Sequence, residues 1–244
     1  MMNRHSPFRS FVFAALLMLL ALTACSAAMG EQARAVPAPK LDAPLATRSG
    51  TQTAVFAGGC FWGMQWVFEH VKGVTNVAAG YSGGAAGTAH YERVSEGDTG
   101  HAESVRVSFD PSQVSYGQLL RVYFSVATDP TQLNRQGPDS GTQYRGVIFY
   151  TNPQQQRIAQ GYVAQLTTAK TYSAPIVTQI VPFKAFYPAE AYHQDYARLN
   201  PDAPYIAIND APKVTQFARW LPNLYRAQPI VYRASASTIG VQVL

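Results

Sequence analysis

Residues 53–63 read Thr-Ala-Val-Phe-Ala-Gly-Gly-Cys-Phe-Trp-Gly, and this stretch decides the fold. Its first five residues predict a short buried strand, and the two glycines that follow allow the backbone to turn sharply. The apolar side chains between Met64 and Val71 recur at i, i+3, i+4 and i+7, which predicts a helix that starts at Cys60. Free N–H groups at a helix start favour an anion, so the sequence places a thiol where its thiolate form is stabilised.

The rest of the chain alternates between further strand and helix patterns. Two of the helices begin with capping signals, Ser115 with Gln118 three residues later and Asn152 followed by Pro153. This interleaving predicts an α+β domain over residues 51–226, a two-layer α/β sandwich on a mixed sheet. We expect strands at 74–79, 104–109, 144–150 and 176–181, and helices at 115–126, 153–168, 189–199 and 214–220.

Composition excludes several classes of protein. The chain has 244 residues, of which 47% are apolar and 14% charged, so long disorder and coiled coil are excluded for most of it. The net charge is +5 without any block of Lys and Arg, which argues against a nucleic-acid partner. The two cysteines, Cys25 and Cys60, are too few for a disulfide scaffold or a cysteine-rich zinc site.

The N-terminus has the pattern of a secretory signal. Basic residues precede an apolar run over residues 11–22, which is shorter than the roughly 20 residues needed to span a bilayer. Leu22-Thr-Ala-Cys25 follows directly and resembles a bacterial lipobox, in which the cysteine is lipid-modified and becomes the mature N-terminus. We therefore predict a lipoprotein signal peptide over residues 1–24 and lipidation of Cys25. The alternative is an ordinary signal peptide cut nearby, for example after Ala28.

The residues on either side of the predicted domain are assigned by composition. Residues 25–50 contain three prolines and many alanines, which predicts a flexible tether. Ser26 is not the aspartate that retains lipoproteins in the inner membrane. In a Gram-negative cell we therefore expect a lipid anchor at the periplasmic face of the outer membrane. Residues 227–244 form a tail of small, polar and β-branched residues to which the sequence assigns no structure.

Gly58–Gly63 resembles the signature of peptide methionine sulfoxide reductase A, the reductase that acts on the S epimer of methionine sulfoxide. The resemblance continues in order along roughly residues 52–200 and implies a ferredoxin-like form of the α+β fold. The further blocks that carry it are Gly80-Tyr-Ser-Gly-Gly84, Tyr91, Thr99-Gly-His-Ala-Glu103, Asp129-Pro-Thr-Gln132, Arg135-Gln-Gly-Pro-Asp139, Gly141-Thr-Gln-Tyr-Arg145 and Ala189-Glu-Ala-Tyr-His-Gln194.

The residue types suit the reduction of a sulfoxide. The sulfoxide sulfur is electrophilic, but its oxygen leaves only after protonation, so the site needs a thiolate nucleophile and an acid. The resemblance implies Cys60 as the nucleophile and Glu103 as the proton donor. It also implies that Tyr91 and Tyr144 hydrogen-bond the sulfoxide oxygen. Attack leaves methionine and a sulfenic acid on Cys60.

Three more residues would hold the substrate. The resemblance implies that Phe61 and Trp62 cage the methyl group and that Asp139 binds the substrate backbone. A carboxylate close to a thiolate forms a like-charge pair, so we expect Cys60 and Glu103 to share one proton in the free enzyme.

The chain departs from the family's common pattern at the resolving cysteine. Many members carry one after an Asn-Pro near the C-terminus, whereas residues 200–206 read Asn-Pro-Asp-Ala-Pro-Tyr-Ile and no cysteine follows Cys60. The resemblance is therefore to the one-cysteine branch, in which an external reductant, a thioredoxin-like protein or a small thiol, attacks the sulfenic acid directly. We expect no cofactor and no metal, because Glu190 and His193 offer only two ligands. The expected role is repair of methionine sulfoxide in envelope proteins, and free methionine sulfoxide is the other candidate substrate.

A hydrolase stays open from the residues alone. Gly80–Gly84 matches G-x-S-x-G, and Asp139 and His193 follow in hydrolase order. A serine hydrolase would use Ser82 as its nucleophile, and a cysteine hydrolase would pair Cys60 with His193. The residues after Gly84 do not predict the helix that a nucleophile elbow needs, which argues against the serine enzyme.

A binding module is the alternative that is not an enzyme. Phe61, Trp62 and Tyr91 would then be ligand-binding aromatics of a lipoprotein, and a Cys60→Ser variant would keep its function. His101 and His193 are interpreted as structural residues, since single histidines in such positions usually satisfy local hydrogen bonds.

Overall fold

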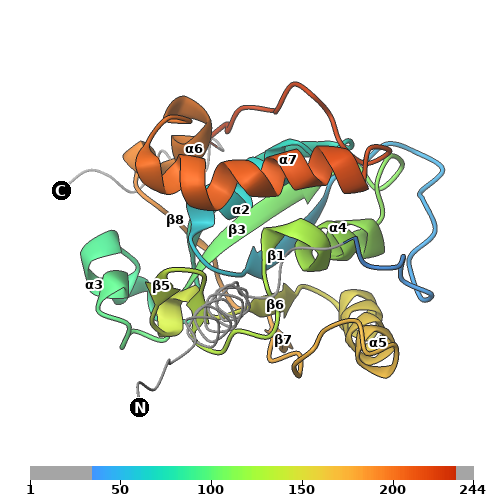
Figure 1. Cartoon of the computed structure of the whole chain (residues 1–244), viewed down its shortest axis with the longest axis horizontal. Helices are drawn as coiled ribbons and strands as arrows, with labels where there is room; N and C mark the ends of the chain where they lie inside the picture. Colours follow the sequence, from blue (N-terminus) through green and yellow to red (C-terminus); the bar gives the residue numbers. More distant parts are fainter. Residues whose placement is uncertain (1–34, 235–244) are drawn as a thin grey trace, which may run out of the picture. The chain divides into compact units, whose positions relative to one another are not determined.

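The computed structural model describes residues 35–234, so the predicted signal peptide over residues 1–24 and the predicted lipidation site Cys25 lie outside the described part (Figure 1). No helix within residues 35–234 is long and apolar enough to cross a membrane. The elements in chain order are β1 (Gln52–Ala57), α2 (Phe61–Glu69), β2 (Val74–Ser82), η1 (Ala86–Thr88), α3 (Tyr91–Ser95), β3 (Ala102–Phe109), α4 (Tyr116–Val122), η2 (Tyr123–Ala127), β4 (Arg135–Gln136), β5 (Asp139–Ser140), η3 (Thr142–Tyr144), β6 (Val147–Tyr150), α5 (Pro153–Thr168), β7 (Gln179–Pro182), β8 (Tyr187–Pro188), η4 (Ala191–His193), α6 (Tyr196–Leu199), η5 (Ile206–Asp210) and α7 (Ala211–Trp220).

Six strands form one mixed sheet in the order β7-β6-β1-β3-β2-β8. β1 pairs antiparallel with β3, from Gln52 opposite Phe109 to Ala57 opposite Ser104, and antiparallel with β6 on its other side. β6 and β7 run parallel, whereas β2 pairs antiparallel with both β3 and β8. The predicted α+β class with a mixed sheet is confirmed.

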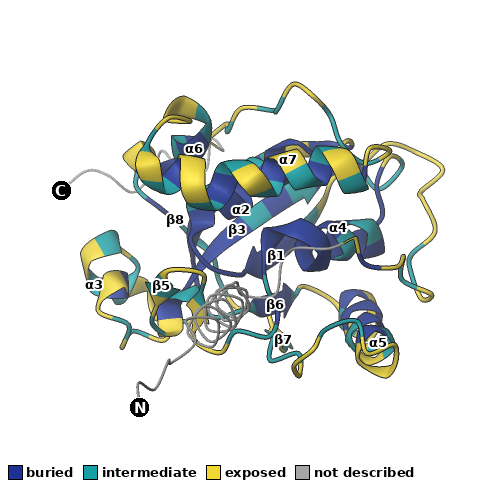
Figure 2. Ribbon diagram, in the orientation of Figure 1, coloured by how far each residue is buried: buried dark blue, intermediate teal, exposed yellow. Residues whose placement is uncertain are grey.

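Helices cover one face of this sheet and build the main core. Successive residues of a strand point to opposite faces, so Phe56 joins the large core with α2, α4 and α5, whereas Val55 joins a small cluster on the other face. Met64 and Phe68 of α2 are completely buried in the large core. Figure 2 shows α2 and the central strands β1 and β3 as mostly buried, while α5 and α7 each turn an exposed side outward. The result is the two-layer arrangement that the sequence predicts.

The capping signals in the sequence are present as hydrogen bonds. The Ser115 hydroxyl accepts the N–H of Gln118, and the Gln118 side chain accepts the N–H of Ser115, which forms a capping box at the start of α4. The Asn152 side chain accepts the N–H of Gln155, and Pro153 is the first residue of α5. Both helix starts therefore lie where the sequence predicts them.

The helix predicted over residues 189–199 is interrupted. Its first part is the short turn η4, and the chain then passes through Asp195 at a φ of 56° before α6 begins. The Asp195 N–H donates to Oε1 of Gln65, and Oε1 of Gln194 accepts the N–H of Ala79. Hydrogen bonds to α2 and β2 thus replace those of a continuous helix, because tertiary contacts override a weak helical pattern.

Residues 35–50, which we call the docked arm, lie in the stretch predicted as a flexible tether but are fixed to the domain. Val36 is 1% exposed, and its N–H donates to the hydroxyl of Ser125. Asp42 accepts the N–H of Gly117 at 2.8 Å, in the first turn of α4. The prolines and alanines suggest a free linker, but Val36 and Asp42 find partners that composition does not reveal.

Residues 227–234, the described part of the predicted tail, run back along the end of α2. The N–H of Ile230 donates to the carbonyl oxygen of Glu69, and the N–H of Tyr232 donates to the carboxylate of Asp195. This stretch is therefore attached to the domain through backbone donors.

Candidate active site

Cys60 is the N-cap residue of α2, at the end of a tight connection from β1. Gly59 has a φ of 102°, and a Cβ atom there would lie 2.5 Å from the side chain of Gln136, so the chain can take this path only with glycine. Cys60 is 8% exposed, and the backbone N–H of Trp62 donates toward its sulfur. The helix start predicted at Cys60 is confirmed.

Glu103 lies in β3 and reaches the start of the same helix. Its Oε2 accepts the N–H of Phe61 at 3.0 Å, which joins the carboxyl group to the residue after Cys60. Burial raises the pKa of Glu103 to about 8, although the hydrogen bond from Phe61 acts in the opposite direction. The predicted acid therefore carries its proton at neutral pH.

The thiol is protonated as well. Burial raises the pKa of Cys60 well above its ordinary range, and the nearby carboxyl groups of Glu103 and Asp210 add to this effect. We expected Cys60 and Glu103 to share one proton, but each group holds its own at pH 7. The reason is that desolvation penalises both anions, and this effect outweighs the favourable position at a helix start. The substrate thus meets a neutral pair.

Tyr91 and Tyr144 are placed by two separate turns near this pair. Tyr91 is the first residue of α3, and its N–H donates to Oε1 of Glu190 at 3.0 Å, while Tyr144 is the last residue of η3. Burial raises the pKa of both phenols, and the charge of Glu103 raises each of them further. Both hydroxyl groups therefore stay protonated and able to donate a hydrogen bond close to Glu103.

Trp62 is held by ring neighbours and by one hydrogen bond. Its ring stacks on Tyr196 with 4.0 Å between centroids and packs edge-on with Tyr205 at 6.0 Å. Its indole N–H donates to Nδ1 of His193 at 3.1 Å. Phe61 is buried, and its ring lies 5.0 Å from that of His193. The two aromatics after the cysteine thus form a fixed apolar wall, which suits a methyl group.

The catalytic groups of a hydrolase are not assembled. Ser82 is the last residue of β2, and its hydroxyl donates to the carbonyl oxygen of Ala185 at 2.9 Å. His193 accepts from Trp62 through Nδ1, and its Nε2 faces Glu190 at 3.9 Å. Nε2 has no hydrogen-bond partner among residues 35–234, and neither Ser82 nor Cys60 hydrogen-bonds to the ring, so the hydrolase alternative has no support.

Comparison with known proteins agrees with this geometry. A family model described as peptide methionine sulfoxide reductase matches residues 52–223. The chain belongs to this family. The predicted enzyme class, a peptide-methionine (S)-S-oxide reductase, is confirmed, because the curated relatives carry the name of this reductase.

The similarity of this reductase to its relatives extends over nearly their whole length. It is 58% identical over 188 residues to peptide methionine sulfoxide reductase MsrA 2 of Mesorhizobium japonicum, which covers 77% of this chain and 96% of the relative. It is 48% identical over 211 residues to MsrA 2 of a Synechocystis species, which covers 86% of this chain and 99% of the relative. The solved structure of methionine sulfoxide reductase A of Corynebacterium diphtheriae matches with a TM-score of 0.55 at 34% identity, over 72% of this chain and 90% of that chain.

The structure adds residues of the reductase that its sequence motifs did not indicate. The Tyr205 hydroxyl donates to the carboxylate of Asp139 and so orients the predicted substrate-binding group. Asp210 and Lys213 form an ion pair at 3.0 Å beside α2. Tyr205, Asp210 and Lys213 belong to no motif with a fixed spacing from Cys60. In the sequence, the stretch around them is notable only because it lacks the resolving cysteine of other family members. His193, interpreted as structural, contacts the aromatic wall directly.

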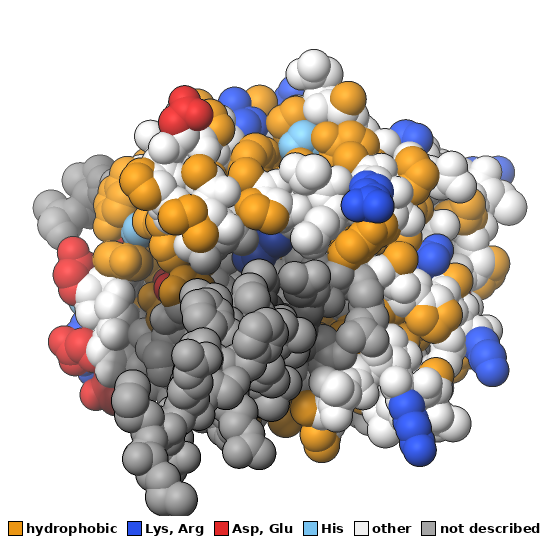
Figure 3. Space-filling model, in the orientation of Figure 1, with side chains coloured by type: hydrophobic (Ala, Val, Ile, Leu, Met, Phe, Trp, Pro, Cys, Tyr) orange, Lys and Arg blue, Asp and Glu red, His pale blue; other side chains and the backbone are white. Residues whose placement is uncertain are grey.

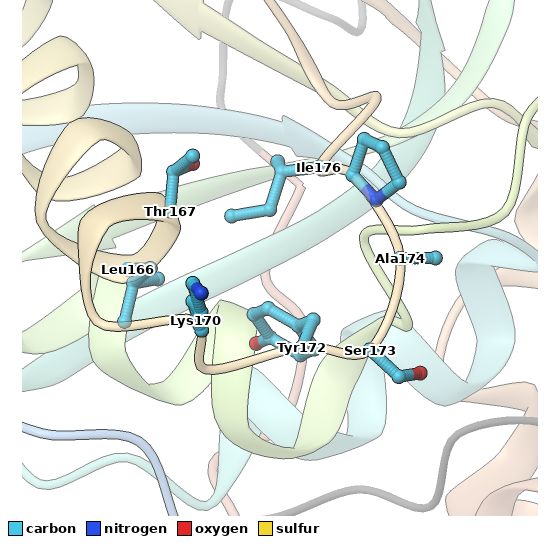
Figure 4. A pocket seen from close by; sticks show the side chains of 8 residues that line it. Leu166, Thr167, Lys170, Tyr172, Ser173, Ala174 and Ile176 are labelled. Carbon is cyan, nitrogen blue, oxygen red and sulfur yellow. The ribbon is translucent and has the colours of Figure 1, made fainter.

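Other surface features of the reductase lie apart from this site. A hollow at the C-terminal end of α5 is lined by Leu166, Lys170, Ile176 and their neighbours, and by none of the predicted site residues (Figure 4). On the face drawn in Figure 3, Lys and Arg side chains stand apart from one another rather than forming one basic patch. Within residues 35–234, no three His, Cys, Asp or Glu side chains gather in a group that could hold a metal ion.

Proposed function

We propose that this reductase works through a sulfenic acid on Cys60, which an external thiol converts back to the thiol. The observation that carries the proposal is the hydrogen bond from the Phe61 N–H to Glu103, because it holds a protonated acid beside Cys60. Tyr91 and Tyr144 are the proposed donors to the sulfoxide oxygen. The proposed substrate contacts are Phe61 and Trp62 on the methyl group and Asp139 on the backbone.

The first step transfers one oxygen atom. The Cys60 sulfur attacks the sulfoxide sulfur while Glu103 donates its proton to the sulfoxide oxygen, and the thiol proton passes to Glu103. The oxygen then moves to Cys60, which is oxidised by two electrons to the sulfenic acid, and the substrate is reduced by two electrons to methionine. Glu103 therefore begins and ends the step protonated, and a pKa of about 8 suits a group that both gives and takes a proton.

The second step needs thiols from outside the described domain. Cys60 is the free cysteine of residues 35–234, and no other cysteine follows it in the sequence. One external thiol attacks the Cys60 sulfur and releases water, and a second thiol breaks the mixed disulfide. A thioredoxin-like protein or a small thiol supplies both.

We also propose that the chain acts in the cell envelope, anchored by a lipid on Cys25, where it repairs oxidised methionine in envelope proteins. The support is the lipobox pattern of Leu22–Cys25 directly after the apolar run. Cells fed labelled palmitate should label the wild-type protein, whereas a Cys25→Ala variant should remain unlabelled. An equally labelled variant would contradict the anchor.

The reaction is tested with the separated S and R epimers of a capped methionine sulfoxide, using dithiothreitol as the reductant. We expect reduction of the S epimer alone and no reduction by a Cys60→Ser variant. In the absence of reductant, one turnover should leave a sulfenic acid that dimedone traps in one-to-one ratio with the protein. A product that dimedone does not modify, together with a normal first turnover, would contradict the sulfenic acid.

A further inference from the structure

Lys213 is a cation at a place where a helix does not favour one. It is the third residue of α7, and the first turn of a helix carries a partial positive charge that stabilises acidic residues. Its Nζ donates to Oδ1 of Asp210 at 3.0 Å. Asp210 is fully buried, and its second carboxylate oxygen has no hydrogen-bond partner among residues 35–234. Lys213 is therefore held in place as the group that compensates for a buried charge.

This ion pair lies against the turn of helix that carries Cys60. A Cβ atom on Gly63 would lie 2.0 Å from Oδ1 of Asp210 and 3.1 Å from Nζ of Lys213. Gly63 follows Cys60 by three residues, so the two positions share one side of α2. The missing side chain at Gly63 thus allows the ammonium group to approach this side of the helix.

The other charged groups that act on the thiol are acids. The negative charges of Glu103, Asp210 and Asp139 each oppose ionisation of the Cys60 thiol. The positive charge of Lys213 instead attracts the anionic forms of Cys60 and Asp139. An ammonium group has three N–H donors, and Asp210 accepts from one of them. The Lys213 side chain is 19% exposed, so it keeps access to a ligand that enters from solvent.

We propose that Lys213 binds the α-carboxylate of methionine S-sulfoxide when that residue is a free amino acid or the last residue of a chain. The proposal rests on the proposed function and adds a substrate class to it, namely sulfoxides that carry a carboxylate. Asp139 faces the backbone nitrogen of such a substrate, and Lys213 faces its carboxylate. A residue inside a chain presents a neutral amide at the same place and gains no charge-assisted hydrogen bond there.

Three substrates separate this role from a merely structural one. They are free L-methionine S-sulfoxide, its N-acetyl derivative, which mimics a C-terminal residue, and its N-acetyl methylamide, which has no carboxylate. For Lys213→Met we expect KM to rise roughly tenfold or more for the two carboxylates and to change by less than about twofold for the methylamide. Lys213→Arg keeps the charge and should restore most of the affinity for both carboxylates.

The comparison is made between substrates within one variant, so a change in folding affects all three alike. A parallel change for the three substrates, or no change for any of them, would overturn the role of Lys213. A rise confined to the free amino acid would also overturn it, because the N-acetyl derivative carries the same carboxylate. If the wild-type enzyme with dithiothreitol fails to reduce the methylamide, the failure lies instead in the proposed function. The double variant Asp210→Asn with Lys213→Met removes the buried charge as well and should show the same selectivity if the single variant does not fold.

Discussion

Replacing Glu103 by Gln should make the protein more stable while it removes the proposed acid. Gln has nearly the same size and can still accept the N–H of Phe61, but it carries no charge. Burial raises the pKa of Glu103 from 4.5 to about 8, so at pH 7 the folded protein keeps a proton that the unfolded chain releases. Release of this proton favours unfolding, and the stability of the wild-type protein therefore falls as the pH rises from 4.5 to 8.

The expected magnitude follows from the two pKa values. Each tenfold change in ionisation is worth about 1.4 kcal/mol, so the roughly 2.5 pH units between 4.5 and 7 correspond to about 3 kcal/mol. The Glu103→Gln variant should exceed the wild-type free energy of unfolding by that amount at pH 7 and by close to zero at pH 4. Urea unfolding followed by tryptophan fluorescence at several pH values measures the difference.

One control variant and one activity measurement complete the test. The side chain of Glu92 is 81% exposed, so Glu92→Gln leaves no buried polar atom unpaired and should change stability only slightly. Glu103→Gln should also lose most of its turnover, because it cannot donate a proton to the sulfoxide oxygen. A stability difference between Glu103→Gln and wild type that is the same at pH 4 and pH 7 would refute the raised pKa, and unchanged turnover would refute the role as acid.

Three further substitutions probe other parts of the domain. Asp42→Ala removes a hydrogen-bond acceptor at the start of α4, so the free energy of unfolding in urea should fall by about 1–2 kcal/mol while kcat/KM stays unchanged. An unaltered urea midpoint would mean that the docked arm contributes no stability. Ser82→Ala loses only the hydrogen bond from the Ser82 hydroxyl to the carbonyl oxygen of Ala185, so reductase activity should persist. A folded but inactive variant would support Ser82 as a nucleophile. Gly63→Ala brings a Cβ atom 2.0 Å from Oδ1 of Asp210 and should lower stability by about 1–3 kcal/mol in thermal unfolding, whereas a wild-type melting temperature would show that the ion pair moves aside freely.

Features encoded by near neighbours in the chain could be predicted from the sequence. The two glycines and the apolar spacing after them locate Cys60 at a helix start, and Asn152 with Pro153 locates the start of α5. Each of these depends on backbone geometry within a few residues, which the residue types themselves determine. The order of the six strands was not predicted, because pairing depends on contacts between distant segments.

The remaining features of the site depend on tertiary packing. The left-handed backbone at Asp195 results from hydrogen bonds to α2, and the partners of Tyr205 and Lys213 are Asp139 and Asp210. The protonation of the Cys60 and Glu103 pair could not be predicted either, since sequence reveals the like charges but not how completely water is removed from them. Burial decides that question, and burial is a property of the folded chain.

Met64 is the single methionine of residues 35–234, and its side chain points from α2 into the core, where it is completely buried. A reductase of this family works where oxidants are present, and those oxidants attack accessible thioethers first. Residues 35–234 offer them none, so this part of one molecule does not become a rival substrate for the Cys60 of another. More of the active sites then remain free for other oxidised proteins as the oxidant concentration rises.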